Sequence, residues 1–174
     1  MGNIWFTADL HLLHKTIVKF TKRPISQELH DAWLINRINE RVGPRDILYI
    51  LGDFSMDSRS SSELIARAIN GRKHLILGNH DKNLKNSKVF DSVSLIKNIK
   101  PKIDTKRQAI VLCHFPMASW EDKVKESWHL HGHTHGRYRG PGLIWDVGVD
   151  NNNYYPLELS EINTIMNKIN KNEF

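Results

Sequence analysis

Side chains that commonly bind metal ions recur at five places in the sequence, and each place directly follows an apolar run. The five groups, in chain order, are Asp9-Leu10-His11, Gly52-Asp53, Gly78-Asn79-His80-Asp81, His114 and Gly132-His133-Thr134-His135. Carboxylate, imidazole and amide oxygen ligands suit borderline or hard first-row divalent ions, and two such ions held side by side most often activate water against a phosphorus centre. The sequence therefore predicts a two-metal site with hydrolytic chemistry.

The apolar runs that end in these groups are predicted to be buried strands. They cover residues 4–8, 47–51, 74–77, 109–112 and 128–130, with a sixth run at 144–149 and a seventh strand at 93–96. Apolar side chains at helical spacing predict helices over 26–41, with Leu29 and Leu34 on its inner side, over 60–70, and from 160 to 169. Strands that alternate with helices and carry chemistry at their ends indicate an α/β architecture with a ligand crevice at one edge of the sheet.

Length and composition are those of an ordinary globular protein. The 174 residues fit one domain, so we expect residues 1–174 to form a single unit. No apolar stretch approaches the ~20 residues that cross a membrane, and the amino terminus carries no recognisable targeting segment. The single cysteine, Cys113, excludes an intrachain disulfide and agrees with a reducing compartment. We therefore expect a cytoplasmic protein without a membrane partner.

The net charge of +6 is concentrated in segment 82–107, which we call the basic segment. It holds eight basic residues against Asp91 and Asp104; the eight are Lys82, Lys85, Lys88, Lys97, Lys100, Lys102, Lys106 and Arg107. A local positive field can attract an anionic substrate or hold a nucleic-acid backbone. A solvated, lysine-rich face is the simpler interpretation.

The five groups together, in this order, resemble the complete signature of the calcineurin-like metallophosphoesterases. The chain is similar to the small bacterial and phage enzymes of that superfamily from residue 3 to about residue 156. This resemblance implies a two-layer β-sandwich flanked by helices, with the site at one end of the strands. A structural zinc site is a poor alternative, because such sites usually use thiolates and the chain has one cysteine.

The resemblance also implies a ligand set for each of two ions. The set is Asp9, His11 and His135 for the first ion, Asp53 as the carboxylate that bridges both, and Asn79, His114 and His133 for the second. A water shared between two such ions loses a proton near neutral pH and can attack phosphorus as hydroxide. The expected cofactors are two divalent ions, with Mn²⁺ favoured and Ni²⁺, Fe²⁺, Co²⁺ or Zn²⁺ as alternatives.

His80 would not bind metal in this scheme. It would face the substrate and protonate, or hydrogen-bond, the leaving-group oxygen, while Asp81 holds its other ring nitrogen. Three further side chains are predicted to contact the phosphate: His14 and Arg23, in the loop after the first strand, and Arg137, after the last metal group. A plain surface role is the alternative for each of these three.

The sequence thus predicts a metal-dependent phosphoesterase that hydrolyses a phosphomonoester or a phosphodiester. A small-molecule substrate is favoured, because the chain has no added domain to grip a polymer. The rival enzyme is a nuclease or nucleic-acid end-processing phosphatase that uses the basic segment. Outside enzymes, the alternative is a metal-stabilised interaction module. The native metal pair and the oligomeric state stay open at this point.

Overall fold

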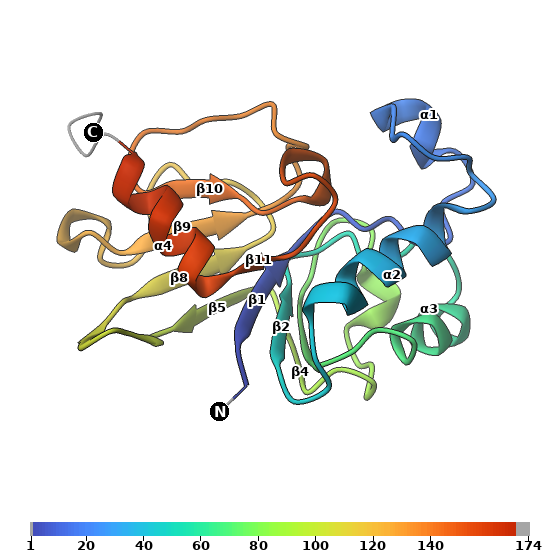
Figure 1. The fold of residues 1–174 in the computed structure, drawn as a ribbon, viewed down its shortest axis with the longest axis horizontal. Coiled ribbons are helices and arrows are strands. Elements are labelled where there is room, and N and C mark those ends of the chain that lie inside the picture. Colours follow the sequence, from blue (N-terminus) through green and yellow to red (C-terminus); the bar gives the residue numbers. More distant parts are fainter. Residues whose placement is uncertain (1, 170–174) are drawn as a thin grey trace.

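Two β-sheets face each other at the centre of the molecule, and the computed structural model describes residues 2–169 (Figure 1). The first sheet has the strand order β11-β1-β2-β3-β4. Its parallel strands are β1 (Ile4–Thr7), β2 (Ile47–Ile50), β3 (Arg72–Ile76) and β4 (Ser92–Ser94). The short strand β11 (Leu157–Glu158) pairs with β1 in the antiparallel sense and closes one edge.

The second sheet has the order β10-β9-β8-β5. Its strands are β5 (Ile96–Ile99), β8 (Ile110–Cys113), β9 (Trp128–His131) and β10 (Ile144–Asp146). Strands β8, β9 and β10 are parallel, whereas β5 is antiparallel to β8. A separate hairpin of β6 (Lys102–Ile103) and β7 (Lys106–Arg107) connects β5 to β8.

Helices cover the outer face of the first sheet and one side of the sandwich (Figure 1). The α-helices are α1 (Ile17–Thr21), α2 (His30–Arg41), α3 (Arg59–Ala66) and α4 (Leu159–Lys168), and the 3-10 helices are η1 (Lys82–Leu84), η2 (Lys123–Lys125) and η3 (Val149–Asn151). Side chains alternate along the strands of the first sheet, so β1, β2 and β3 each contribute to two cores. On β2, Leu48 and Ile50 pack with Leu34 of α2, whereas Tyr49 packs with residues of the second sheet such as Leu112.

This arrangement confirms the expected α/β fold, a two-layer sandwich flanked by helices. Five of the predicted strands are present with ends shifted by one or two residues, and the run at 144–149 is a strand only as far as Asp146. The predicted strand at 93–96 is divided between β4 and β5, and the three predicted helices are present. Helix α2 begins at His30 rather than Ser26, because residues 26–29 form a turn, and Leu29 is 58% exposed rather than on the inner side. Helix α3 ends at Ala66, and turns continue to residue 70.

The carboxyl ends of the parallel strands meet at one edge of the sandwich. An isolated parallel bridge between Ala8, after β1, and Gly148, after β10, links the two sheets there. Among the described residues, no helix has the length and apolar character that crossing a membrane requires. The expectation of a single domain over residues 1–174 extends to residues 1 and 170–174, which lie outside the described part.

Candidate metal centre

The predicted metal ligands adopt a backbone conformation that L-residues rarely take. Five of them lie in the left-handed region: Asp9 (φ 57°), His11 (49°), Asp53 (51°), His133 (68°) and His135 (48°). Each follows a strand end, where the chain must turn sharply to aim its side chain across the edge of the sandwich. Such strain persists only where the surrounding structure enforces it, and it concentrates at functional sites.

Glycines before the ligands allow the loops to come this close together. A Cβ on Gly132 would lie 2.6 Å from the Ala8 methyl group and 2.8 Å from the Asp9 carboxylate, and one on Gly78 would collide with the Asp53 carboxylate. Only a residue without a side chain fits at these two positions. The Gly-Asn and Gly-His pairs of the motifs are therefore explained by close approach of the backbone.

The first group that could hold an ion consists of Asp9, His11 and His135, whose ligand atoms lie within 4.8 Å of one another. Asp9 and His11 are buried, and both ring nitrogens of His11 are buried without a hydrogen-bond partner. Burial raises the pKa of Asp9 to about 7 and lowers the pKa of His11 to about 3. A neutral, unpaired imidazole beside a buried carboxyl group is stable only with a further partner, and a divalent ion fits that role.

The second group consists of Asp53, His114 and His133, and it meets the same distance limit. His114 is fully buried, whereas His133 and the neighbouring Asn79 are exposed. The amide oxygen of Asn79 lies 3.2 Å from Nε2 of His114. The second group therefore lies at the mouth of the site, and the first lies beneath it.

Asp53 belongs to the second group and also approaches the first. Its Oδ2 atom is 3.7 Å from Nε2 of His11 and 3.5 Å from Nε2 of His114. These distances are too long for hydrogen bonds. They are close to the roughly 3.4 Å that separates two ligand atoms when each lies about 2.1 Å from the same tetrahedral ion. Burial by itself would raise the pKa of Asp53, but the His114 ring, the His80 amide and the His11 ring together lower it to about 2. An ionised carboxylate in this position can be shared by two ions.

Hydrogen bonds outside the two groups orient the ligand side chains. Nδ1 of His114 donates to the Leu51 carbonyl at 2.8 Å, and Nδ1 of His135 donates to the Asp150 carboxylate at 2.7 Å, so Nε2 of both rings stays available to a metal. The Asp9 carboxylate accepts from the His133 amide at 2.9 and 3.0 Å. The donor set and its support therefore fit a pair of divalent ions.

Arg23 is one of the residues predicted to contact the phosphate. Its guanidinium group is buried and donates to Asp150 at 2.9 and 2.8 Å, to the Leu10 carbonyl at 2.9 Å and to the Asp9 carbonyl at 2.7 Å. It also lies 2.6 Å from Nε2 of His30. Its donors are directed at these protein atoms, so Arg23 positions Asp150 and the Asp9 loop, and the phosphate contact stays a prediction.

Asp81 is the residue predicted to hold the His80 ring. Its carboxylate accepts from the amides of Asp53 at 2.8 Å, Phe54 at 2.9 Å and Gly78 at 2.9 Å. In the part of the chain that the structure describes, no hydrogen bond joins it to the His80 ring. Asp81 therefore fixes the two glycine loops that carry Asp53 and Asn79, and its pairing with His80 stays a prediction.

The remaining predicted residues lie around the mouth of the site. The exposed ring of His80 has Nε2 3.9 Å from Oδ2 of Asp53 and its centroid 5.6 Å from that of His11. The half-buried ring of His14 meets His11 edge-on at 5.9 Å. Arg137 is exposed, and its Nε donates to the Thr134 carbonyl at 3.4 Å. His80 and His14 are placed to meet a bound ligand, whereas Arg137 is free to turn toward the site or away from it.

Two supporting carboxylates were given no role by the sequence. Asp150 receives Arg23 and His135, and burial would raise its pKa, but those two partners lower the pKa to about 2. Asp146 accepts from the Thr134 hydroxyl at 2.7 Å and from the amides of Gly136 and Gly148 at 2.8 and 2.7 Å, which fixes the loop of His133 and His135. Asp146 lies inside the sixth apolar run and Asp150 directly follows it, as acidic residues follow the first three runs, and this position is the signal that could have identified them.

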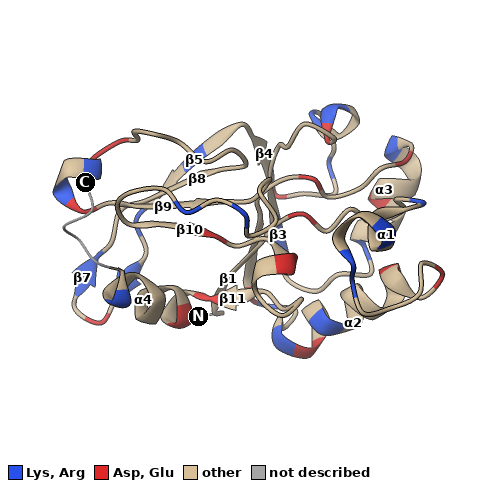
Figure 2. Cartoon of the chain, turned by 90° about the horizontal axis from the view of Figure 1, so that it is seen from above, with Lys and Arg blue, Asp and Glu red and all other residues tan. Residues whose placement is uncertain are grey.

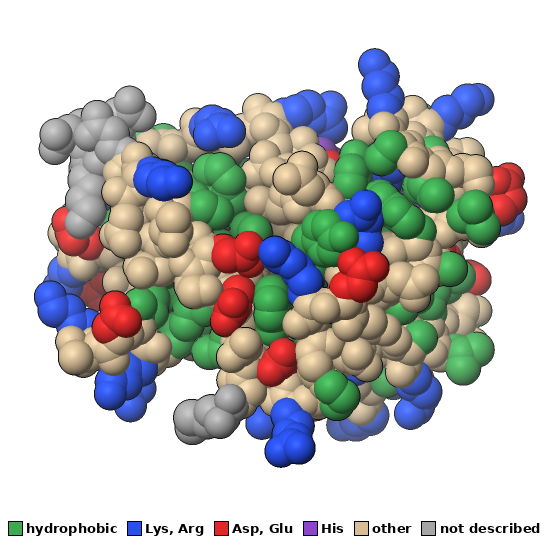
Figure 3. Space-filling view, in the orientation of Figure 1, with side chains coloured by type: hydrophobic (Ala, Val, Ile, Leu, Met, Phe, Trp, Pro, Cys, Tyr) green, Lys and Arg blue, Asp and Glu red, His purple; other side chains and the backbone are tan. Residues whose placement is uncertain are grey.

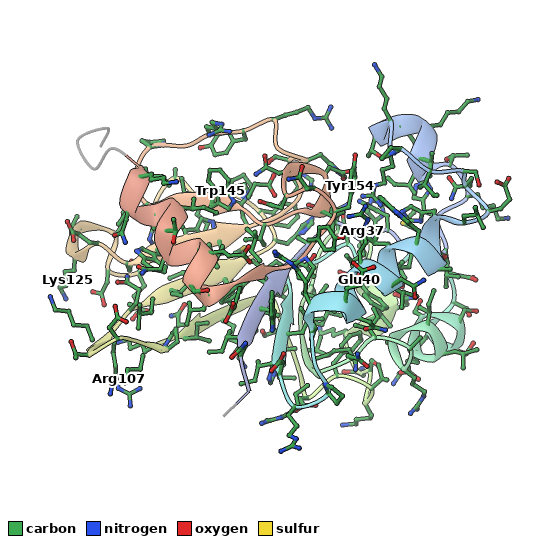
Figure 4. All side chains as sticks on the ribbon, viewed as in Figure 1. Arg37, Glu40, Arg107, Lys125, Trp145 and Tyr154 are labelled. Atoms are coloured by element: carbon green, nitrogen blue, oxygen red, sulfur yellow. The ribbon has the colours of Figure 1, made fainter. Side chains whose placement is uncertain are left out.

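The basic segment does not form one surface. Its hairpin, β6 and β7, lies at the start of β8, whereas His114 follows the end of that strand, about 13 Å further along. Figure 2 shows the basic residues of β7 at one end of the molecule. On the face in Figure 3, Lys and Arg occur around the outline and also near the centre rather than in one area. Arg107 lies at the far corner from Tyr154, which follows η3 beside the site (Figure 4).

Comparison with known proteins agrees with this geometry. A model of the calcineurin-like phosphoesterase family matches residues 2–137. The chain is 34% identical over 164 residues to the Gene 66 protein of Mycobacterium phage L5, covering 78% of each chain, and 31% identical over 162 residues to the Gene 66 protein of phage D29, covering 79% of this chain and 80% of the relative. A crystal structure of a protein of unknown function, AQ665 from Aquifex aeolicus, superposes with a TM-score of 0.74 and 25% identity, covering 95% of this chain and all of that one.

Proposed function

The chain belongs to the calcineurin-like phosphoesterase family, which supports a metal-dependent hydrolase of phosphate esters, and from the site we propose a dinuclear enzyme that acts on small phosphomonoesters or phosphodiesters. The observation that carries this proposal is that Asp53, a member of the second group of three potential ligands, also approaches His11 of the first group. Two ions bound there would lower the pKa of a shared water, which is the chemistry they supply. Mn²⁺ is the proposed resident metal, and Ni²⁺, Fe²⁺, Co²⁺ and Zn²⁺ are the alternatives.

Asp53 and Asp9 would hold the ions and neutralise part of their charge at the edge of the sandwich. Asp9 is held from below by the Arg23 guanidinium on its carbonyl and by the His133 amide on its carboxylate. Asp53 is held through its own amide by Asp81. Because these contacts exist before any ligand binds, the site needs little rearrangement when substrate enters.

His80 is the proposed general acid. It is exposed at the mouth, its amide donates to Asp53 at 3.1 Å, and its ring extends beside the position between the two groups. A phosphate held there would bring its leaving-group oxygen within reach of an imidazole N–H. Because the Asp81 carboxylate accepts from three backbone amides, the proposed general acid His80 acts without a hydrogen-bonded carboxylate partner and can recover its proton from solvent.

The division of the basic segment supports a small substrate. A nuclease needs a continuous positive surface that follows several phosphates, but the basic residues of the β6–β7 hairpin lie at the opposite end of β8 from the site. Lys82, Lys85 and Lys88, which follow His80 along the chain, remain as a local source of positive field. This field can attract a small anion without holding a polymer.

A substrate screen of the metal-reconstituted protein tests the proposal. The substrates are p-nitrophenyl phosphate, bis-p-nitrophenyl phosphate, cyclic nucleotides and short single-stranded oligonucleotides, with each of the five metals. We expect hydrolysis of at least one small ester, and replacement of His80 by Ala should lower kcat by roughly 10²- to 10⁴-fold while two ions still bind. Inactivity with every metal would favour an interaction module, and a preference for oligonucleotides that falls steeply with salt would favour a nuclease.

A further inference from the structure

One exposed aromatic side chain lies directly against the proposed second metal group. Phe115 is 44% exposed, and its ring centroid is 4.9 Å from that of His114 and 4.8 Å from that of His133. Eight other large apolar side chains are exposed in residues 2–169, and none of them makes a ring contact with a predicted metal ligand. Both contacts of Phe115 are edge-to-face, with interplanar angles of 77° and 64°. Much of its surface therefore stays open beside the ions.

The backbone presents Phe115 in a fixed position. Below the loop, the buried ring of His129 donates from Nδ1 to the Val111 carbonyl at 3.0 Å and accepts from the Met117 amide at its Nε2 at 3.2 Å. Burial lowers the pKa of His129 to about 4, so its ring is neutral and can accept this bond. A phenylalanine held in one place at the mouth loses little conformational freedom when a ligand packs on it.

We infer that Phe115 binds a planar aromatic group of the substrate, either an aryl ester or a nucleobase. The inference rests on the proposed function and specifies the substrate class of the same site. A phosphate bound through ions held by His114 and His133 would have its ester group near Phe115, because the Phe115 ring contacts both histidine rings. Aromatic pairs gain more than their buried area, whereas a small alkyl group would cover only part of the ring. Phe115 therefore favours aromatic over alkyl esters.

Binding of two phosphonates that differ only in this group tests the inference. Phenylphosphonate and methylphosphonate share the anionic head but are not hydrolysed, so calorimetry of the Mn²⁺-loaded protein measures affinity apart from turnover. We expect Phe115→Ala to weaken phenylphosphonate by about fivefold and to leave methylphosphonate unchanged. Phe115→Trp should keep the preference for phenylphosphonate over methylphosphonate. Phe115→Leu, which keeps apolar bulk without a ring, should lose that preference.

Control variants and substrates separate the possible outcomes. Leu64→Ala removes another exposed apolar side chain, on α3, and should leave both affinities unchanged. KM values for phenyl phosphate, uridine 5′-monophosphate and ribose 5-phosphate then distinguish an aryl group from a nucleobase. Equal weakening of both phosphonates by Phe115→Ala, or no effect on either, would overturn the inference and leave Phe115 as packing for His114 and His133. If the wild-type protein neither binds methylphosphonate nor hydrolyses any ester, the proposed function itself is wrong.

Discussion

Replacement of Arg23 tests whether this buried cation supports the metal centre or meets the substrate. Arg23→Ala would remove both donors to Asp150 and the donors to the Leu10 and Asp9 carbonyls, so that the Asp150 carboxylate keeps only His135 as its partner. Loss of one partner from a buried ion pair usually costs about 3–5 kcal/mol. For a chain of this length, such a loss lowers Tm by about 10 °C. Arg23→Lys keeps the charge but loses the paired donors, so its Tm should lie between those of wild type and Arg23→Ala.

The assay is thermal unfolding of the metal-free protein with a chelator present, because bound ions would add their own stabilisation. The matched control is Arg137→Ala, since Arg137 is exposed and makes only a long bond to the Thr134 carbonyl; its Tm should stay within about 2 °C of wild type. The reasoning is refuted if Arg23→Ala unfolds near the wild-type temperature while the loaded enzyme shows a raised KM. Arg23 would then be a phosphate contact after all.

Three more predictions follow from the contacts around the site. Asp150→Asn removes the charge that faces His135, so affinity for the first Mn²⁺ should fall by about 10- to 100-fold in calorimetric titrations; unchanged affinity would show that His135 needs no orienting carboxylate. Asp81→Ala leaves two buried amides and one half-buried amide without their acceptor, so the stability of the chelated protein in urea should fall by about 3 kcal/mol. If instead the variant keeps full stability and loses as much activity as His80→Ala, Asp81 pairs with His80 in catalysis. The pKa of His129 is about 4 in the folded protein against an ordinary 6.5, so the unfolded chain takes up a proton first as the pH falls. Stability should therefore decrease between about pH 6.5 and pH 4, and His129→Gln should make this decrease smaller. Equal pH dependence of the two proteins would contradict a buried neutral ring.

Apolar periodicity and residue types were enough to predict an α/β fold with metal-binding side chains at the strand ends, whereas the two-layer sandwich and the assignment of seven ligands came from the resemblance to the calcineurin-like family. Apolar runs of three to five residues that are followed by Asp, Asn or His indicate both a strand and a ligand group, because a parallel strand presents its last residues at the sheet edge. Prediction was weaker where turn geometry competes with helical spacing. Residues 26–29 have helical periodicity, but they form a turn and α2 starts at His30, which leaves Leu29 exposed.

The roles of the polar side chains around the ligands depended on contacts far apart in the chain. Arg23 meets Asp150 across 127 positions, and Asp81 reaches the amides of Asp53 and Phe54 across 28 and 27. A long charged side chain next to a motif can equally face solvent, a phosphate or a buried carbonyl. Only the packing of the loops decides which polar groups are buried and therefore need that side chain as a hydrogen-bond partner.

By itself, the sequence determined which atoms can bind metal and the order in which strand ends deliver them, since both follow from residue type and local periodicity. The tertiary structure decided what holds those atoms in place. It also divided a charge run that is continuous in sequence between two ends of the molecule, because β5 and β8 carry the chain away from the site and back. Distance along the chain therefore says little about distance in space.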